Sequence, residues 1–124
     1  MKTIRLLAFG FLALLTGCTQ RITDFTVMSG KNIDVAALGK TRHMSQRVRG
    51  KDIGHIFLFI PVKFPNIKDA MDNGMEKAPG SIALVDGVVY SQFYWVIPLI
   101  YGQANYIVEG NPLFNSPSNP APKK

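Results

Sequence analysis

The chain has 124 residues, a formal net charge of +6 at pH 7 and one cysteine. This length is sufficient for one domain with its own hydrophobic core and excludes two domains of ordinary size. Because the basic residues include Lys2 and Arg5 near the amino terminus and two lysines at the carboxyl terminus, the part that folds is only mildly basic. It carries no nucleic-acid-binding motif, and its single thiol, Cys18, excludes an internal disulfide and a zinc site built on several thiolates.

Residues 1–17 have the three-part pattern of an export signal. Lys2 and Arg5 supply positive charge, and residues 6–15 form an uncharged apolar run. The two residues that follow, Thr16 and Gly17, are small. An apolar run of this length covers roughly 15 Å as a helix, about half of the hydrocarbon core of a bilayer. We therefore expect a leader that is cleaved rather than a transmembrane helix.

The sequence Leu15-Thr16-Gly17-Cys18 resembles the lipobox of bacterial lipoproteins. The resemblance implies that the sulfur of Cys18 receives a diacylglyceryl group and that the chain is cut between Gly17 and Cys18. A thiol suits this chemistry because sulfur is a strong nucleophile near neutral pH, and two or more acyl chains hold a protein stably on a membrane. Residue 19 is Thr and not Asp, which in enteric-type lipoproteins favours the outer membrane, facing the periplasm. An ordinary secretory leader with an incidental cysteine is the alternative.

Residues 18–30 are predicted to form the lipidated amino terminus and a linker. Residues 32–38 alternate apolar and polar side chains, which predicts a strand. Residues 40–52 are strongly basic and indicate a solvated hairpin or loop. The alternative is a basic patch that contacts anionic lipid head groups or a cell-wall polymer beside the acyl anchor. The residues of this patch are Lys40, Arg42, Arg47, Arg49 and Lys51.

An apolar segment precedes the clearest helix of the sequence. Residues 56–62 are aromatic and aliphatic, which predicts a short buried strand or an extended core segment. Residues 65–78 have apolar positions spaced three and four apart, which indicates a helix with one buried stripe. Asn66 is the expected N-cap, and we expect Asp69, three residues later, to complete a weakened form of the capping box. Gly74 on the stripe allows a close approach to a sheet.

Residues 81–92 have a strong strand pattern that contains Asp86-Gly87. This pair forms either a two-residue hairpin turn or a bulge in one long strand, and the long strand is favoured because neither half alternates cleanly. Residues 93–101, which include Trp95, are interpreted as core, with a ligand groove or a protein contact as the alternative. Residues 103–109 are predicted to form the last strand.

These elements predict a single α+β domain over residues 31–110. The expected architecture is a small two-layer domain, with one main helix packed on a three- to four-stranded antiparallel or mixed sheet. Residues 111–124 are rich in Pro, Asn, Ser and Lys, which indicates a flexible tail.

Residues 66–112 resemble the second half of small bacterial lipoproteins of the tRNA-associated-locus-like family. The shared features are the lipobox at Cys18, an Ala-rich helix containing Ala70, a strand with Val85-Asp86, and a final strand ending in Val108-Glu109-Gly110. The family has no defined activity to carry over. The resemblance therefore implies a fold and an envelope location, and it implies no catalytic residue.

The sequence offers no catalytic or metal-binding constellation. Gly39-Lys40-Thr41 lacks the earlier glycine of a phosphate-binding loop, because Asp34 stands at that position. His43 and His55 are the only histidines and have no acidic pair at ligand spacing. We therefore expect a non-enzymatic envelope lipoprotein without a cofactor or metal, anchored to the membrane by its lipid and contacting another envelope protein. A small-ligand or metal-binding lipoprotein is the alternative.

Overall fold

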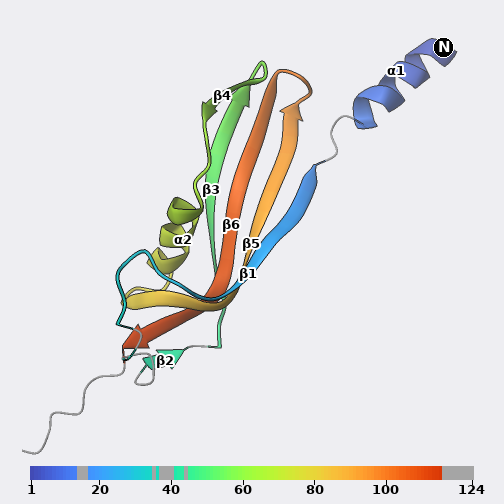
Figure 1. The fold of residues 1–124 in the computed structure, drawn as a ribbon. Helices are drawn as coiled ribbons and strands as arrows, with labels where there is room; N and C mark the ends of the chain where they lie inside the picture. The colour runs from blue at the N-terminus through green and yellow to red at the C-terminus, as the bar shows by residue number, and fades with distance from the viewer. Residues whose placement is uncertain (14–16, 35, 37–40, 44, 116–124) are drawn as a thin grey trace, which may run out of the picture.

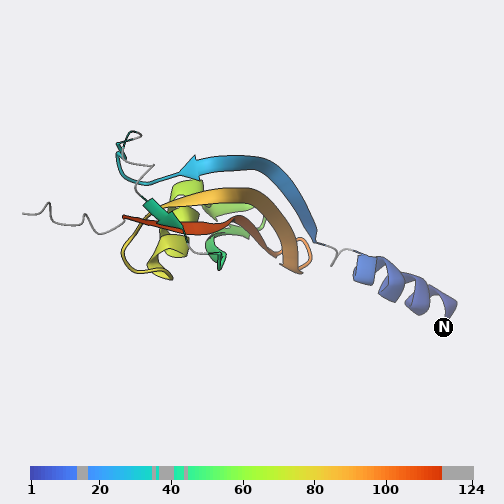
Figure 2. The ribbon, with the colours of Figure 1, turned by 90° about the horizontal axis from the view of Figure 1, so that it is seen from below.

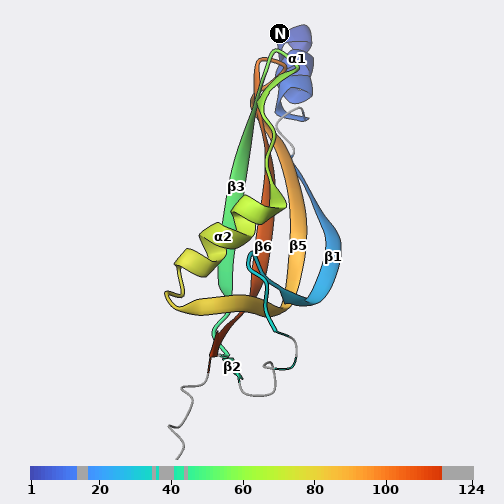
Figure 3. The ribbon, with the colours of Figure 1, turned by 60° about the vertical axis from the view of Figure 1, so that its left-hand side comes forward.

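The structure, a computed structural model, describes residues 1–13, 17–34, 36, 41–43 and 45–115. In chain order the elements are α1 (Lys2–Ala13), β1 (Cys18–Met28), β2 (Thr41–His43), β3 (Val48–Phe57), β4 (Ile60–Lys63), α2 (Ile67–Glu76), β5 (Ser81–Ile97) and β6 (Tyr101–Asn115). The described strands form one antiparallel sheet in the order β1-β5-β6-β3-β4, and β2 pairs with the end of β6 (Figure 1). Helix α2 packs on one face of this sheet (Figure 3).

The prediction of an α+β domain with a helix on an antiparallel sheet is confirmed, but the predicted number of strands is wrong. Within the described residues the sheet has six strands instead of three or four. The predicted linker, residues 18–30, is largely strand β1, which pairs with β5 from Cys18 to Met28. The predicted tail, residues 111–124, begins inside β6, which continues to Asn115.

The strand predicted over residues 32–38 is also wrong for the part that the structure describes. Residues 32–34 have no regular structure, and Ala36 has a 3-10 helical backbone conformation rather than that of a strand. Val35, residues 37–40 and residues 116–124 lie outside the described residues. The chain here is attached to the sheet by Ser29, whose hydroxyl donates to the carbonyl of Ile82 at 2.7 Å.

Helix α2 is the element that the sequence predicts best. Asn66 is its N-cap, and the Asn66 side chain accepts a hydrogen bond from the backbone N–H of Lys68 at 2.9 Å. The predicted apolar stripe faces the sheet. The buried residues of this core are Ala70, Met71, Leu84, Val89 and Val108.

The close approach of α2 to the sheet depends on Gly50 of β3 more than on Gly74. A Cβ atom at Gly50 would overlap the carbonyl oxygen of Ala70 and the backbone nitrogen of Gly74. A Cβ atom at Gly74 would instead lie 3.1 Å from the backbone nitrogen of Gly50, a contact that a small shift relieves. Gly50 therefore fixes the place where helix and sheet meet.

Strand β5 runs unbroken through Asp86-Gly87, as the residue pattern on both sides of this pair predicts. It has 17 residues, and its register with β6 shifts between Val85 and Val88. Asp86 lies in the left-handed region with a φ of 49°, which identifies a bulge rather than a hairpin turn. The long strands are strongly curved (Figure 2).

Candidate functional site

Cys18 is the first residue of β1 and is exposed. Gly17 lies close to β5, because a Cβ atom on it would lie 2.9 Å from the Cβ of Tyr94. Residues 2–12 of α1 are exposed along the whole helix. No helix in the described part of the chain is both long enough and apolar enough to cross a bilayer.

The strand register shows which residues share the end of the sheet with Cys18. Cys18 pairs with Phe93 of β5, Phe93 with Ala104 of β6, and Ala104 with Gly54 of β3. Strand β1 begins at this level, but the β3–β4 and β5–β6 hairpins both extend beyond it (Figure 1). Their turns therefore form the outermost part of the domain at the Cys18 end.

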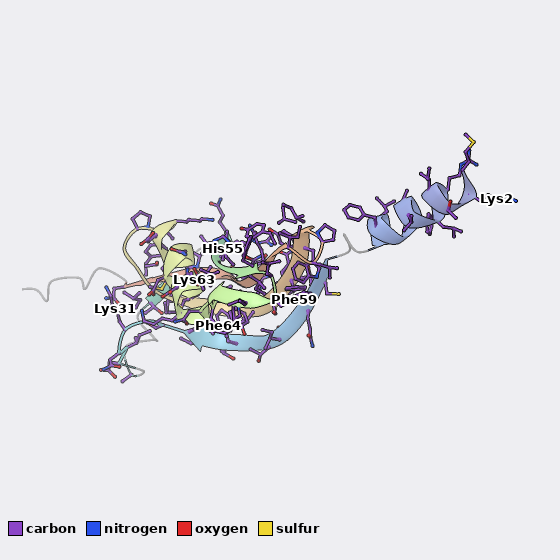
Figure 4. All side chains as sticks on the ribbon, turned by 90° about the horizontal axis from the view of Figure 1, so that it is seen from above. Lys2, Lys31, His55, Phe59, Lys63 and Phe64 are labelled. Carbon is purple, nitrogen blue, oxygen red and sulfur yellow. The ribbon has the colours of Figure 1, made fainter. Side chains whose placement is uncertain are left out.

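These two hairpin ends form an exposed apolar surface, which we call the apolar tip. Its nine large apolar side chains are 44% to 72% exposed. They are Phe57, Leu58, Phe59, Ile60, Val62, Val96, Ile97, Leu99 and Ile100. Figure 4 shows Phe59 on this half of the domain, with Phe64, His55 and Lys63 nearer to α2.

The prediction that residues 56–62 are buried is wrong. Helix α2 meets β3 at Gly50, seven positions before Phe57, so it covers the other half of the sheet. The interpretation of residues 93–101 as core is correct only in part, because Val96 and Ile97 are exposed whereas Trp95 is half-buried. Sequence reasoning missed the apolar tip because an apolar run has the same pattern in a core and on an exposed hairpin.

Aromatic and polar side chains lie directly behind the tip. Trp95 packs edge-on against Phe59 and Phe93, with ring centroids 5.5 Å apart in each pair. A chain of hydrogen bonds crosses the three central strands. It runs from the Tyr94 hydroxyl to Gln103 at 2.5 Å, from Gln103 to the Tyr101 hydroxyl at 3.1 Å, and from that hydroxyl to Nδ1 of His55 at 2.7 Å.

Asp52 is the one buried carboxylate among the described residues, at 6% exposure. It accepts hydrogen bonds from Nζ of Lys63 at 2.7 Å and from the backbone N–H of Asn66 at 2.8 Å. Burial disfavours its charge and acts to raise its pKa, but these hydrogen bonds outweigh burial and hold the pKa of Asp52 below the ordinary value. Asp52 therefore takes the position that the sequence assigns to Asp69, because it satisfies the Asn66 N–H of the predicted capping box.

The predicted basic patch does not gather beside Cys18. Arg47 donates to the carbonyl of Asp86 at 2.5 Å, Arg49 pairs with Glu109 at 3.3 Å, and the Lys51 ammonium lies 5.9 Å from the ring centroid of Tyr94.

The register shows how far these side chains lie from the cysteine. In the strand register, Arg49 of β3 lies opposite Glu109 of β6, and Glu109 lies opposite Val88 of β5. Val88 in turn lies opposite Asp24 of β1. Arg49 is thus six strand positions from Cys18, about 20 Å along the sheet. Lys40 and the side chain of Arg42 lie outside the described residues.

The described residues contain no group of three His, Cys, Asp or Glu side chains that could hold a metal ion. The ring of His55 is hydrogen-bonded to Tyr101, and the side chain of His43 lies outside the described part of the chain. Two open surface hollows lie among the described residues. One of them lies over the β5 bulge and is lined by Arg21, Asp24, Arg47 and Asp86.

Comparison of this chain with protein-family models, with curated proteins and with solved structures finds no match.

Proposed function

We propose that this protein is a lipoprotein of the bacterial cell envelope, held to its membrane by a diacylglyceryl group on Cys18. The observation that carries the proposal is the lipobox sequence of residues 15–18, which directly follows an uncharged apolar run. The exposure of Cys18 supports it, because a lipid attached to that sulfur does not have to enter the core.

The position of Cys18 gives the anchor a direct effect on the orientation of the domain. Cleavage before Cys18 removes α1 and leaves every strand of the sheet intact. The lipid is then attached to the first residue of a strand that pairs with β5 along its length, with no linker between them. The Cys18 end of the sheet is therefore held toward the bilayer.

The domain itself is proposed to be a non-enzymatic interaction module at the outer membrane, facing the periplasm. Its resemblance to the tRNA-associated-locus-like lipoproteins is part of the same proposal. Asp52 and His55 support this proposal, because both side chains are engaged in contacts that hold the fold together. Asp52 joins Lys63 to the start of α2, and His55 is hydrogen-bonded to Tyr101. Among the described residues, the exposed apolar surface is the main feature available for binding.

Metabolic labelling tests the anchor. The full-length chain is expressed in a bacterial host with a labelled fatty acid, next to Cys18→Ala and the adjacent control Thr19→Ala. We expect label and membrane fractionation for wild type and for Thr19→Ala, and loss of both label and cleavage for Cys18→Ala. An unlabelled wild-type protein would contradict the proposal.

A further inference from the structure

We infer that the apolar tip is a lipid-binding surface that inserts into the bilayer beside the acyl chains on Cys18. This inference rests on the proposed lipid anchor, and it goes further by assigning a partner to the exposed hairpin ends. The domain then has two membrane contacts at one end, one covalent and one made by its own side chains.

The chemistry of the tip is uniformly apolar. Residues 56–62 and 93–102 contain no Asp, Glu, Lys or Arg. The tip side chains are 44% to 72% exposed, although burial of each would be favourable. Exposed apolar surface of this extent marks a contact with another protein or with a membrane. Because the tip consists of two protruding turns, it fits a fluid acyl layer without requiring a matching pocket.

The turns of the apolar tip have positive φ angles, and this backbone conformation favours residues other than the large apolar ones found there. Leu58 and Phe59 form a two-residue turn with φ values of 46° and 66°, and Leu99 has a φ of 62°. Side chains with a Cβ atom disfavour this left-handed region, and Asn-Gly is the preferred pair in such a turn. Folding alone does not account for large apolar residues at these positions, whereas insertion into lipid does.

The distance between the tip and Cys18 matches the depth of an interfacial contact. Cys18 is level with Gly54, and β3 continues three positions further to Phe57. At the rise of a strand this is about 10 Å, and elements that lie in the membrane interface bury roughly 5–10 Å of their apolar side. With the glyceryl group of Cys18 at the head-group level, the tip reaches the acyl chains.

The side chains behind the tip follow the polarity gradient of a bilayer surface. Tyr94 and Trp95 lie just before the tip on β5, and Tyr101 is level with the tip residue Ile97. These rings border the tip, where such rings are enriched in membrane proteins. In the strand register Lys63 of β4 lies opposite His55 of β3, and Lys51 lies four positions before His55 on β3. The Lys63 ammonium is already paired with Asp52. The Lys51 ammonium lies 5.9 Å from the ring centroid of Tyr94, on the head-group side, where anionic lipids attract cations.

Trp95 allows a direct test, because it is the only tryptophan in the chain. The full-length protein is purified from a bacterial host with its lipid and reconstituted into phosphatidylethanolamine and phosphatidylglycerol vesicles. The vesicles contain either plain or brominated acyl chains, and bromine quenches a tryptophan only at close range. We expect brominated chains to remove most of the Trp95 emission.

Two variants separate insertion from folding. Leu58→Asn combined with Leu99→Asn makes both turns polar with a residue that tolerates positive φ, so the fold is retained. This double variant should lose most of the quenching. The control Val27→Asn makes the same kind of change at an exposed residue that pairs with Val85, far from the tip, and should keep it.

The outcomes distinguish this inference from the anchor on which it rests. Mass spectrometry of the Cys18 peptide measures lipidation separately, and an unmodified peptide refutes the lipid anchor. In that case the quenching of Trp95 in vesicle-bound protein still tests whether the tip inserts. Equal Trp95 emission in plain and brominated vesicles overturns tip insertion, as does full quenching of the double variant. The occupant of the tip is then a protein partner or a second copy of the chain.

Discussion

Gly50 is the residue at which β3 and α2 come closest, so Gly50→Ala should force the helix away from the sheet. The added Cβ would overlap the carbonyl oxygen of Ala70 and lie 2.7 Å from the Cα of Gly74, whereas ordinary carbon contacts are about 3.5–4.0 Å. Backbone atoms cannot move aside as a flexible side chain does. A helix displacement of roughly 1 Å loosens the packing of Met71 on Leu84, and we expect the free energy of unfolding to fall by about 3 kcal/mol or more.

Gly74→Ala is the matched control, because it adds the same methyl group on the other side of the same contact. Its Cβ would lie 3.1 Å from the backbone nitrogen of Gly50, and alanine is favoured over glycine in a helix by about 1 kcal/mol. These effects oppose each other, so its stability should stay within about 1 kcal/mol of wild type. Urea unfolding followed by circular dichroism measures both variants, and equal losses would refute the assignment of Gly50 as the contact point.

Three further predictions concern single side chains. Asp52→Asn should cost about 1–2 kcal/mol at pH 7, since a carboxylate with two hydrogen bonds becomes neutral. Because the folded-state pKa of Asp52 is lowered, its contribution is present above the unfolded value of about 3.9 and is lost as pH falls through the folded value. The wild-type and Asp52→Asn unfolding curves should therefore converge in acid, and a gap that persists there would contradict this. Leu58→Asn should raise the thermal midpoint, because it relieves a left-handed leucine; a lower midpoint would show that the tip is needed for folding. Asn105→Val should be neutral or stabilising by about 1 kcal/mol in urea unfolding, since the buried Asn105 amide has no hydrogen-bond partner among the described residues. A fall in the free energy of unfolding of more than about 1 kcal/mol would show that the amide has a partner.

Helix α2 and the β5 bulge were predictable because their signals are local. Asn66 caps the helix through its own side chain, and the spacing of the apolar stripe is complete within the segment. Asp86 with Gly87 limits the choices to a turn or a bulge, and the apolar residues on both sides favour the long strand that the structure has.

The partner of the Asn66 N–H was not predictable, because it is non-local. Asp52 is 14 residues away in the chain and is brought to the helix by the β3–β4 hairpin. Asp69 has the expected spacing for a capping box, and nothing in the sequence indicates that a buried carboxylate from a strand takes its place.

Strand β1 was not predicted because an edge strand with two exposed faces lacks the alternation that identifies a half-buried strand. Of its side chains, only Phe25 and Met28 are even partly buried, and both lie in its second half. The residues next to Cys18 are held by backbone pairing with β5, to which their side chains add little. The exposure of the apolar tip is not predictable for a different reason, because hydropathy reports the character of a residue and not what covers it.

Phe25 is one of the two partly buried side chains of β1 and packs on the sheet. Its ring lies against Gly87 and Gly110, where a Cβ atom on either glycine would meet it. Phe25→Ala removes this contact and should cost about 2–3 kcal/mol, less than for a fully buried phenylalanine. The cost should fall mainly on β1, because Met28 is the only other side chain of this strand that is even partly buried. Hydrogen exchange should therefore accelerate at the β1 amides while those of β6 stay protected. In vesicles the lipid would then be joined to the domain by a released segment, so Trp95 quenching should decrease although the tip is unchanged. Unaltered protection of β1 in Phe25→Ala would show that backbone pairing with β5 is sufficient to hold the anchor strand.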